Sequence, residues 1–156
     1  MEPKLFTIDE YVRWSDVDYA GIIFYGAYVR FFEIAETELF REAGLPYGEF
    51  FDRLGIWLPR VHLDCDFMYT ARLDDALRVA AYVSRFGSTS ITLNFDVLHI
   101  ASRSLTAAGH EVLVCTDRES MRPRALPDEL KMSLEGYRLS EFEARDQLGA
   151  KVTAAT

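Results

Sequence analysis

A change in the period of the apolar residues constrains the fold of this chain more than any other feature of its sequence. Between residues 27 and 43, apolar side chains recur every three or four positions, which predicts an amphipathic helix. Gly44 and Pro46 predict the end of that helix. Beyond residue 60 the apolar residues alternate with polar ones, which is typical of strands with one buried face.

Five strands are predicted in this way, and short turns join the last four. They lie within residues 5–14, 61–68, 77–83, 91–98 and 110–117, with turns at the sequences FGSTS and TAAG. Strands that follow one another through short turns form an antiparallel sheet. The expected architecture is therefore α+β, with one long helix packed on a curved five-stranded antiparallel sheet. One helix covers only one face of such a sheet, so association of several chains is expected to cover the rest.

The remaining segments predict a single domain with a short tail. A length of 156 residues suits one domain with its own core. The link 45–59 is expected to be irregular or briefly helical, and a short helix is expected from Pro127 to about Gly136. The domain is therefore assigned to residues 1–136, and the polar segment 137–156 is expected to be a partly helical or disordered tail.

The net charge and the cysteine content indicate which binding partners and which cellular compartment to expect. The chain carries 17 Lys and Arg against 25 Asp and Glu, a formal charge of −8, so a nucleic-acid partner is not expected. Two cysteines without CxxC spacing favour a reducing compartment, and the N-terminal sequence does not resemble a signal peptide. No apolar run approaches the roughly 18 residues of a membrane span. A cytoplasmic protein without a membrane span is expected.

The best candidate for chemistry is the loop SDVDYAGIIFYG, residues 15–26, which is unusually apolar for a loop. Asp16 and Asp18 are two positions apart, so an extended backbone would point both to one side. A carboxylate in apolar surroundings is a usable base or nucleophile. The following helix start offers unpaired N–H groups that suit a polarised carbonyl. The alternative is that either aspartate merely caps a turn, where Asp is common.

Other polar patterns are interpreted as structural. His62, Asp64 and Asp66 alternate along one predicted strand and are taken as its polar side, so no metal site is expected. His99 and His110 have no partner motif. The sequence contains neither a GxSxG motif nor a glycine-rich phosphate loop.

The loop and the helix after it resemble a known family. The string from Asp16 to Tyr25, followed by an aromatic-rich helix with Glu33 and Glu38, is similar to the active-site signature of hotdog-fold acyl-CoA thioesterases. The resemblance is strongest to the 4-hydroxybenzoyl-CoA thioesterase group and the Tol–Pal-associated acyl-CoA thioesterases. The segments TARLDD (70–75) and MRPRALP (121–127) are also similar, and the likeness covers about residues 5–135. It implies the hotdog fold.

The resemblance also implies roles for individual residues. Asp18 matches the catalytic carboxylate, which attacks the thioester carbonyl or activates water, and the backbone N–H of Tyr25 matches the group that polarises that carbonyl. Asp16 is implied to orient the loop. Gly21, Ile22 and Phe24 are implied to shape the acyl pocket. Gly26 and Tyr28, at the helix start, are also expected to contact the substrate. Gly26 departs from relatives, which carry His or Pro at this position, and this leaves the substrate class open.

Coenzyme A is implied as part of the substrate, and no separate cofactor is expected. Its phosphates are expected to meet one polar turn with Arg85, Ser88, Thr89 and Ser90, or the pair Arg122 and Arg124. The alternative is that these arginines are simply solvated. In the family the site lies between protomers, so the resemblance implies a homodimer or homotetramer with two long helices enclosed by a joined sheet.

Two other functions remain open at this point. A hotdog dehydratase or hydratase is expected to need a histidine paired with an acid, but no histidine precedes residue 60. A non-catalytic protein that binds an acyl carrier or an acyl ligand is the second alternative, although the acidic chain suits an acidic carrier poorly. A thioesterase acting on a small aromatic or short-chain acyl-CoA is the preferred hypothesis.

Overall fold

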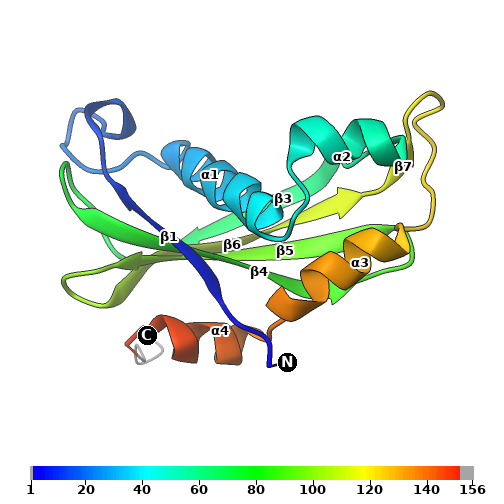
Figure 1. Cartoon of the computed structure of the whole chain (residues 1–156). Coiled ribbons are helices and arrows are strands. Elements are labelled where there is room, and N and C mark those ends of the chain that lie inside the picture. The colour runs from blue at the N-terminus through cyan, green and yellow to red at the C-terminus, as the bar shows by residue number, and fades with distance from the viewer. Residues whose placement is uncertain (1, 152–156) are drawn as a thin grey trace.

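A five-stranded antiparallel sheet with one long helix on its face forms the centre of the molecule (Figure 1). The computed structural model describes residues 2–151. The strands lie side by side in the order β1 (Phe6–Tyr11), β4 (Ala76–Phe86), β5 (Ser90–His99), β6 (Ser104–Val114) and β3 (Arg60–Phe67). All four pairings are antiparallel. The α+β architecture predicted from the sequence is confirmed.

Helix α1 (Ala27–Glu42) packs on the sheet through the stripe that its periodicity predicts. The buried side chains of this stripe include Phe31, Phe32, Ala35 and Leu39. The ring of Phe32 stacks on Phe95 of β5 with centroids 4.7 Å apart. Burial of these large side chains removes apolar surface from water and holds the helix to the sheet. The helix therefore has a fixed position from which its first turn can carry a site.

The predicted turn at TAAG is wrong, because this segment lies inside β6. Gly109 shows the reason: a Cβ atom there would overlap the carbonyl oxygen of Asp64 and would lie 3.0 Å from the Phe32 ring. Small residues in the middle of β6 thus let strand β3 and helix α1 approach closely. The turn before β6 falls instead at residues 100–103.

The link and the region after β6 form smaller elements. They are the 3₁₀ turns Trp14–Asp16 and Glu135–Tyr137, the helices α2 (Tyr47–Leu54) and α3 (Asp128–Leu134), and the paired short strands β2 (Ile56–Trp57) and β7 (Thr116–Asp117). The predicted short helix after Pro127 corresponds to α3 and the turn that follows it.

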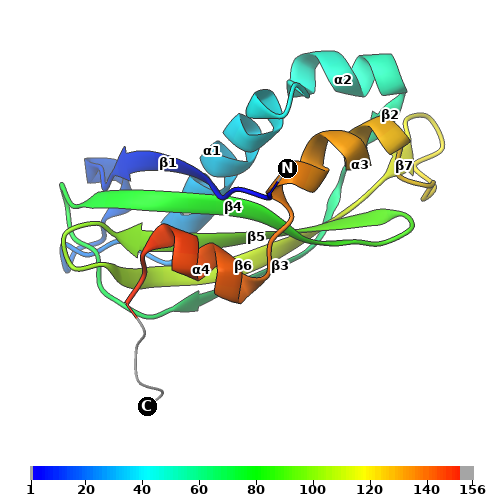
Figure 2. The same cartoon turned by 60° about the horizontal axis from the view of Figure 1, so that its bottom comes forward.

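Part of the expected tail packs on the sheet. Helix α4 (Glu141–Leu148) lies on the face opposite α1, as Figures 1 and 2 show. Ala144 and Leu148 are buried there, and Arg145 contacts the buried carboxylate of Asp96 at 3.3 Å. The chain itself therefore covers part of the face that was expected to need a second chain. Residues 152–156 of the expected tail lie outside the described residues.

None of the helices described between residues 2 and 151 has the length and apolar character needed to cross a membrane.

Candidate functional site

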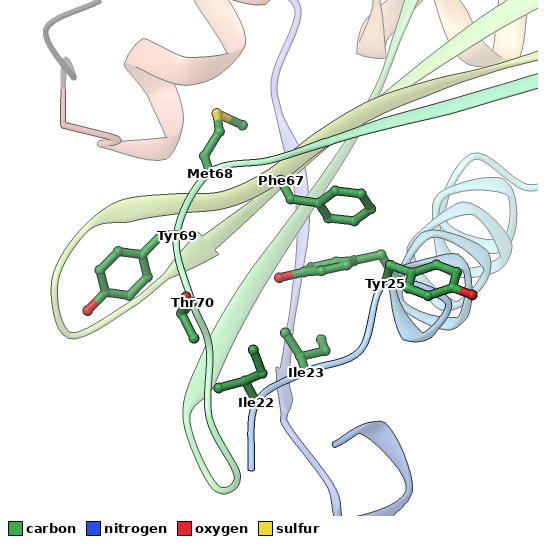
Figure 3. A pocket seen from close by; sticks show the side chains of 8 residues that line it. Ile22, Ile23, Tyr25, Phe67, Met68, Tyr69 and Thr70 are labelled. Atoms are coloured by element: carbon green, nitrogen blue, oxygen red, sulfur yellow. The ribbon is translucent and has the colours of Figure 1, made fainter. Parts of the chain in front are cut away.

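A hollow of about 260 Å³ lies beside the start of α1 (Figure 3). Its lining comes from the approach loop (residues 15–26), the first turn of α1, the end of β3 and the segment that follows it: Ile22, Ile23, Tyr25, Tyr28, Phe67, Met68, Tyr69 and Thr70. In Figure 3, Phe67 points toward the start of α1, whereas Met68 and Tyr69 point away from it. Of the residues predicted for the site in this region, Ile22, Tyr25 and Tyr28 line the hollow, whereas its lining does not include Asp18, Gly21, Phe24 or Gly26.

Asp16 anchors the approach loop to the helix. Its side chain is 2% exposed, and Arg30 donates to both of its oxygens, with Nε 2.9 Å from Oδ1 and Nη2 2.6 Å from Oδ2. The backbone N–H of Arg13 donates to Oδ2 at 2.8 Å. Burial opposes the charged form, but these hydrogen bonds and the charge of Arg30 outweigh it and hold the pKa of Asp16 below its usual value.

Asp18 lies in a different environment from Asp16, so the expectation that both point to one side is wrong. Residues Trp14–Asp16 form a 3₁₀ turn, and a tight turn follows in which Gly21 adopts φ +76°. The Asp18 side chain is exposed and accepts a hydrogen bond from the N–H of Ala20 at 2.8 Å. A single chain therefore does not supply the apolar surroundings expected for this carboxylate.

The start of α1 carries free amide donors. The N–H of Ala27 donates to the carbonyl of Phe24 at 3.0 Å, and that of Tyr28 to the carbonyl of Tyr25 at 3.4 Å. Within the described part of the chain, the N–H groups of Tyr25 and Gly26 donate no hydrogen bond. Two donors at the positive end of a helix suit a carbonyl oxygen that gains negative charge.

The absence of a side chain at Gly26 has a local reason. A Cβ atom there would lie 2.7 Å from the Phe24 ring. That ring packs edge-on against Tyr25, with centroids 6.3 Å apart. Glycine therefore lets the Phe24 ring lie over the helix start, and any larger residue at this position would displace it.

Tyr28 forms an inner wall of the hollow. Its side chain is buried, and its ring lies 5.6 Å from that of Phe67 at the end of β3. Burial raises the pKa of the Tyr28 hydroxyl, although a hydrogen bond with Thr106 opposes the shift. The neutral phenol at this position gives the hollow an aromatic wall with one polar group.

The residues expected to meet the CoA phosphates gather at the other end of the sheet. The β4–β5 turn carries Ser88, and its carbonyl accepts from the N–H of Leu126 at 3.1 Å. The carbonyl of Thr89 accepts from the N–H of Cys115 at 2.7 Å, and Arg124 N–H donates to the carbonyl of Cys115 at 2.9 Å. The full set at this end is Arg85, Ser88, Thr89, Ser90, Arg122 and Arg124.

Strand β4 separates this set from the hollow. The strand begins next to the loop that bridges to Ile22, is 11 residues long and ends at the polar turn, so it spans roughly 35 Å. The two groups of predicted residues therefore do not meet within one chain.

Several lining residues have no clear signal in the amino-acid sequence. Ile23, Phe67, Met68, Tyr69 and Thr70 line the hollow, but only the run of three large apolar residues at 67–69, where the alternation stops, signals an unusual segment. Phe67 is 56% exposed, which is high for a side chain of its size.

Comparison with known proteins agrees with this geometry. Residues 12–134 match the model of the Thioesterase-like superfamily. The acyl-CoA thioester hydrolase YbgC of Escherichia coli O6:H1 is 28% identical over 132 residues, which cover 81% of this chain and 93% of that protein. The 1,4-dihydroxy-2-naphthoyl-CoA hydrolase of Nostoc punctiforme is 25% identical over 146 residues, which cover 94% of this chain and 93% of that protein.

A solved structure shows the same fold. The protein SAV2348 from Staphylococcus aureus, characterised in complex with CoA, superposes with a TM-score of 0.80 at 17% sequence identity. The match covers 99% of this chain and 98% of that chain. The chain therefore belongs to the Thioesterase-like superfamily and is a thioester hydrolase with the hotdog fold.

Proposed function

We propose that this chain hydrolyses acyl-CoA thioesters at the hollow beside the start of α1. The observation that carries the proposal is the pair of free N–H groups of Tyr25 and Gly26, which follow closely on the turn that holds Asp18. Donors aimed at a developing oxyanion typically contribute a factor of roughly 10²–10³ to turnover. The exposed carboxylate of Asp18 on that turn is proposed to supply the second group that thioester hydrolysis needs.

The reaction can follow two courses from the same arrangement. In the nucleophilic course, an Asp18 oxygen attacks the carbonyl carbon, the C–S bond breaks, and the CoA thiolate leaves and takes up a proton. Water then hydrolyses the mixed anhydride. In the general-base course, Asp18 takes a proton from the water that attacks the same carbon, the C–S bond breaks, and the CoA thiolate leaves and takes up that proton. Neither course needs a cofactor beyond the CoA that forms part of the substrate.

We propose that a second copy of the chain completes the site as a homodimer. Among the described residues, strand β3 forms one edge of the sheet with no strand on its outer side, and its Val61 and Leu63 side chains are 61% and 45% exposed. An exposed apolar edge invites another strand. Large apolar side chains are also exposed around the candidate site, namely Trp14, Tyr19, Phe24, Tyr25, Phe67, Met68 and Tyr69. A partner along β3 would cover this surface and surround Asp18 with apolar groups.

The same pairing would bring the residues beside the start of α1 close to those expected to bind the CoA phosphates. When two copies of β3 pair antiparallel about a two-fold axis, the Arg60 end of one lies beside the Phe67 end of the other. The Arg60 end borders a groove of about 390 Å³ with Trp57 and Met121, close to Arg122. Phosphate contacts from Arg122, Arg124 and the β4–β5 turn are thus proposed to come from the partner chain. Because α4 covers part of the other sheet face, a dimer suits this chain better than a tetramer joined through that face.

A small aromatic or short-chain acyl group is the proposed substrate. The hollow presents the rings of Tyr25, Tyr28 and Phe67, which favour contact with a planar ring. One relative is named for an aromatic acyl-CoA and another for acyl-CoA generally. A cytoplasmic location is part of the proposal, because Cys65 and Cys115 are free thiols that suit a reducing compartment.

Thiol release from a panel of aromatic, short-chain and long-chain acyl-CoAs tests the proposal. The Asp18→Asn variant is expected to lose turnover by roughly 10²–10⁴-fold, since it lacks the base or nucleophile. Its fold should persist because the Asp18 side chain is exposed. Asp74→Asn, at another exposed loop carboxylate with φ 68° that asparagine tolerates, is the matched control. Equal turnover in the two variants would overturn the role of Asp18. Acyl-CoA binding without turnover by the unmodified chain would favour a non-catalytic binder instead.

A further inference from the structure

Three side chains meet on the sheet face opposite α1, and they form a typical set of metal ligands. His62 Nε2 lies 3.2 Å from Asp64 Oδ2, and His110 Nδ1 lies 3.0 Å from Asp64 Oδ1. The ligand atoms of all three residues lie within 4.8 Å of one another. We propose that His62, Asp64 and His110 bind one divalent transition-metal ion of the zinc class.

The strand register creates this cluster. His62 and Asp64 alternate along β3, so both point to the same side of the sheet. In the neighbouring strand β6, His110 is the direct partner of Asp64. The histidine rings lie with centroids 5.0 Å apart. Two polar residues on the same face of one strand do not make a metal site by themselves. His110 of β6 supplies a third ligand, so the three side chains together can hold one ion.

The distances from the two histidine nitrogens to the Asp64 oxygens are close to the spacing of ligand atoms around a zinc-class ion. Zinc binds histidine nitrogen and carboxylate oxygen at roughly 2.0–2.2 Å in tetrahedral geometry, which places neighbouring ligand atoms about 3.3 Å apart. The two contacts of Asp64 already have nearly this length. Because these contacts reach the two different oxygens of Asp64, the two imidazoles must move closer together to share one ion. Two nitrogens and one oxygen suit Zn²⁺, Co²⁺ or Ni²⁺ better than Mg²⁺ or Ca²⁺, which prefer oxygen alone.

The surroundings leave room for the ion and its remaining water ligand. Beside the cluster is a polar hollow of about 160 Å³, which Asp66, Asp96 and Glu141 help to line. The cation at this hollow, Arg145, is already paired with Asp96 and Glu141. Asp96 and Glu141 share this one cation and Asp66 adds a further carboxylate, so the hollow keeps a net negative charge that attracts a cation. Strand pairing at the β3 edge would use backbone groups and leave these outward-pointing side chains accessible.

Binding of the ion is expected to hold the edge strand β3 more firmly to the sheet. An ion held by His62 and Asp64 of β3 and by His110 of β6 links the outermost strand to its neighbour. A ligand that binds only the folded state stabilises it, so the ion should raise the melting temperature. The cluster lies on the opposite sheet face from the hollow beside α1, so the ion is not expected to change thioester hydrolysis. The proposal is therefore independent of the proposed function.

Isothermal titration calorimetry of Zn²⁺ into the 156-residue chain, purified without a histidine tag and stripped with a chelator, tests the site. One ion per chain is expected, together with a melting temperature that rises with Zn²⁺ concentration. His62→Ala and His110→Ala should each weaken binding by at least roughly tenfold to 100-fold, because each removes a direct ligand. Electron paramagnetic resonance of the Cu²⁺-loaded chain should show nitrogen ligation that is reduced in either variant.

The chain offers matched controls. His99, the third histidine, lies outside the cluster and contacts Ser102 and Asp75, so His99→Ala should keep one ion per chain. Cys65→Ser should also keep it, since Cys65 points to the other side of β3. Melting curves without metal show whether each variant folds. Absence of saturable binding would overturn the proposal, and so would binding that survives loss of both His62 and His110.

Discussion

The guanidinium of Arg30 on helix α1 binds both carboxylate oxygens of Asp16 in the loop before it, at 2.9 and 2.6 Å. The carbonyl oxygen of Asp16 in turn accepts from the N–H of Phe24 at 3.0 Å. This pair therefore ties both ends of the approach loop to the first turns of the helix. The positions of the Asp18 turn and of the free N–H of Tyr25 depend on it.

Arg30→Gln is expected to lower the free energy of unfolding by about 2 kcal/mol, because it leaves the buried Asp16 carboxylate without its cation. The pKa of Asp16 is lowered in the folded state, so the ion pair stabilises the fold above the unfolded pKa and the effect disappears as the pH falls. Urea unfolding at pH 7 measures the loss of stability in Arg30→Gln, and urea unfolding below about pH 4 shows whether that loss disappears. Arg41→Gln, which breaks only an exposed pair with Glu38, should change stability by less than about 1 kcal/mol. Equal effects of the two variants would contradict the anchoring role.

The buried Glu111 carboxyl predicts a second pH dependence of the free energy of unfolding, opposite in sign to that of Asp16. Its side chain is 6% exposed, and Oε2 has no hydrogen-bond partner within the described residues. Burial and the nearby Glu36 raise its pKa to about 7, although Arg60 opposes the shift. The folded state therefore holds a proton that the unfolded state has released. The stability this proton contributes is lost as the pH rises through about 7.

Glu111→Gln keeps the shape of the neutral side chain and should remove this loss. At pH 8 the variant is expected to be about 2 kcal/mol more stable than the unmodified chain, and the difference should close near pH 4. Guanidinium unfolding across that range measures the difference. Glu119→Gln, at an exposed glutamate, is the control and should show no such trend. A difference that does not vary with pH would contradict the titration of Glu111.

Gly109→Ala is expected to lower the free energy of unfolding by about 3 kcal/mol, because its Cβ would collide with β3 and with the Phe32 ring. The matched control is Gly48→Ala in helix α2, where the added Cβ would meet none of the residues described outside its own helix backbone and chain neighbours within 4 Å. That variant should gain up to about 1 kcal/mol from helix propensity. Denaturant midpoints of the two variants compare them directly. A Gly109→Ala midpoint at or above that of the unmodified chain would show that β3 and α1 can move apart freely.

Leu63→Lys tests the proposed pairing of β3 edges. A charge at this exposed apolar position should block association, so sedimentation equilibrium should give the mass of one chain where the unmodified protein gives two. Thioester hydrolysis should fall by roughly 100-fold, because the partner no longer positions the substrate. Met132→Lys, at an exposed residue of α3, should keep both the dimer mass and the activity. A two-chain mass for Leu63→Lys would contradict pairing through this strand.

Local patterns predicted most of the fold because they report burial directly. The stripe that contains Phe31, Phe32 and Leu39 repeats with the period of a helix, and its residues are buried. The turn predicted at Thr106–Gly109 from its small residues is wrong, because this segment lies inside β6. Their role is to admit the Phe32 ring and strand β3, and such an approach between distant segments leaves no local pattern.

The amino-acid sequence by itself determined the order of helix and strands and the loop that carries Asp18 and Tyr25, since periodicity and turn residues act over short distances. Tertiary structure decided which groups meet. It separated buried Asp16 from exposed Asp18, placed the Arg122 end of the sheet far from the hollow, and set His110 beside Asp64 through strand register. Pairing across a sheet depends on the path of the whole chain, so residues far apart in sequence acquire a shared chemistry only after folding.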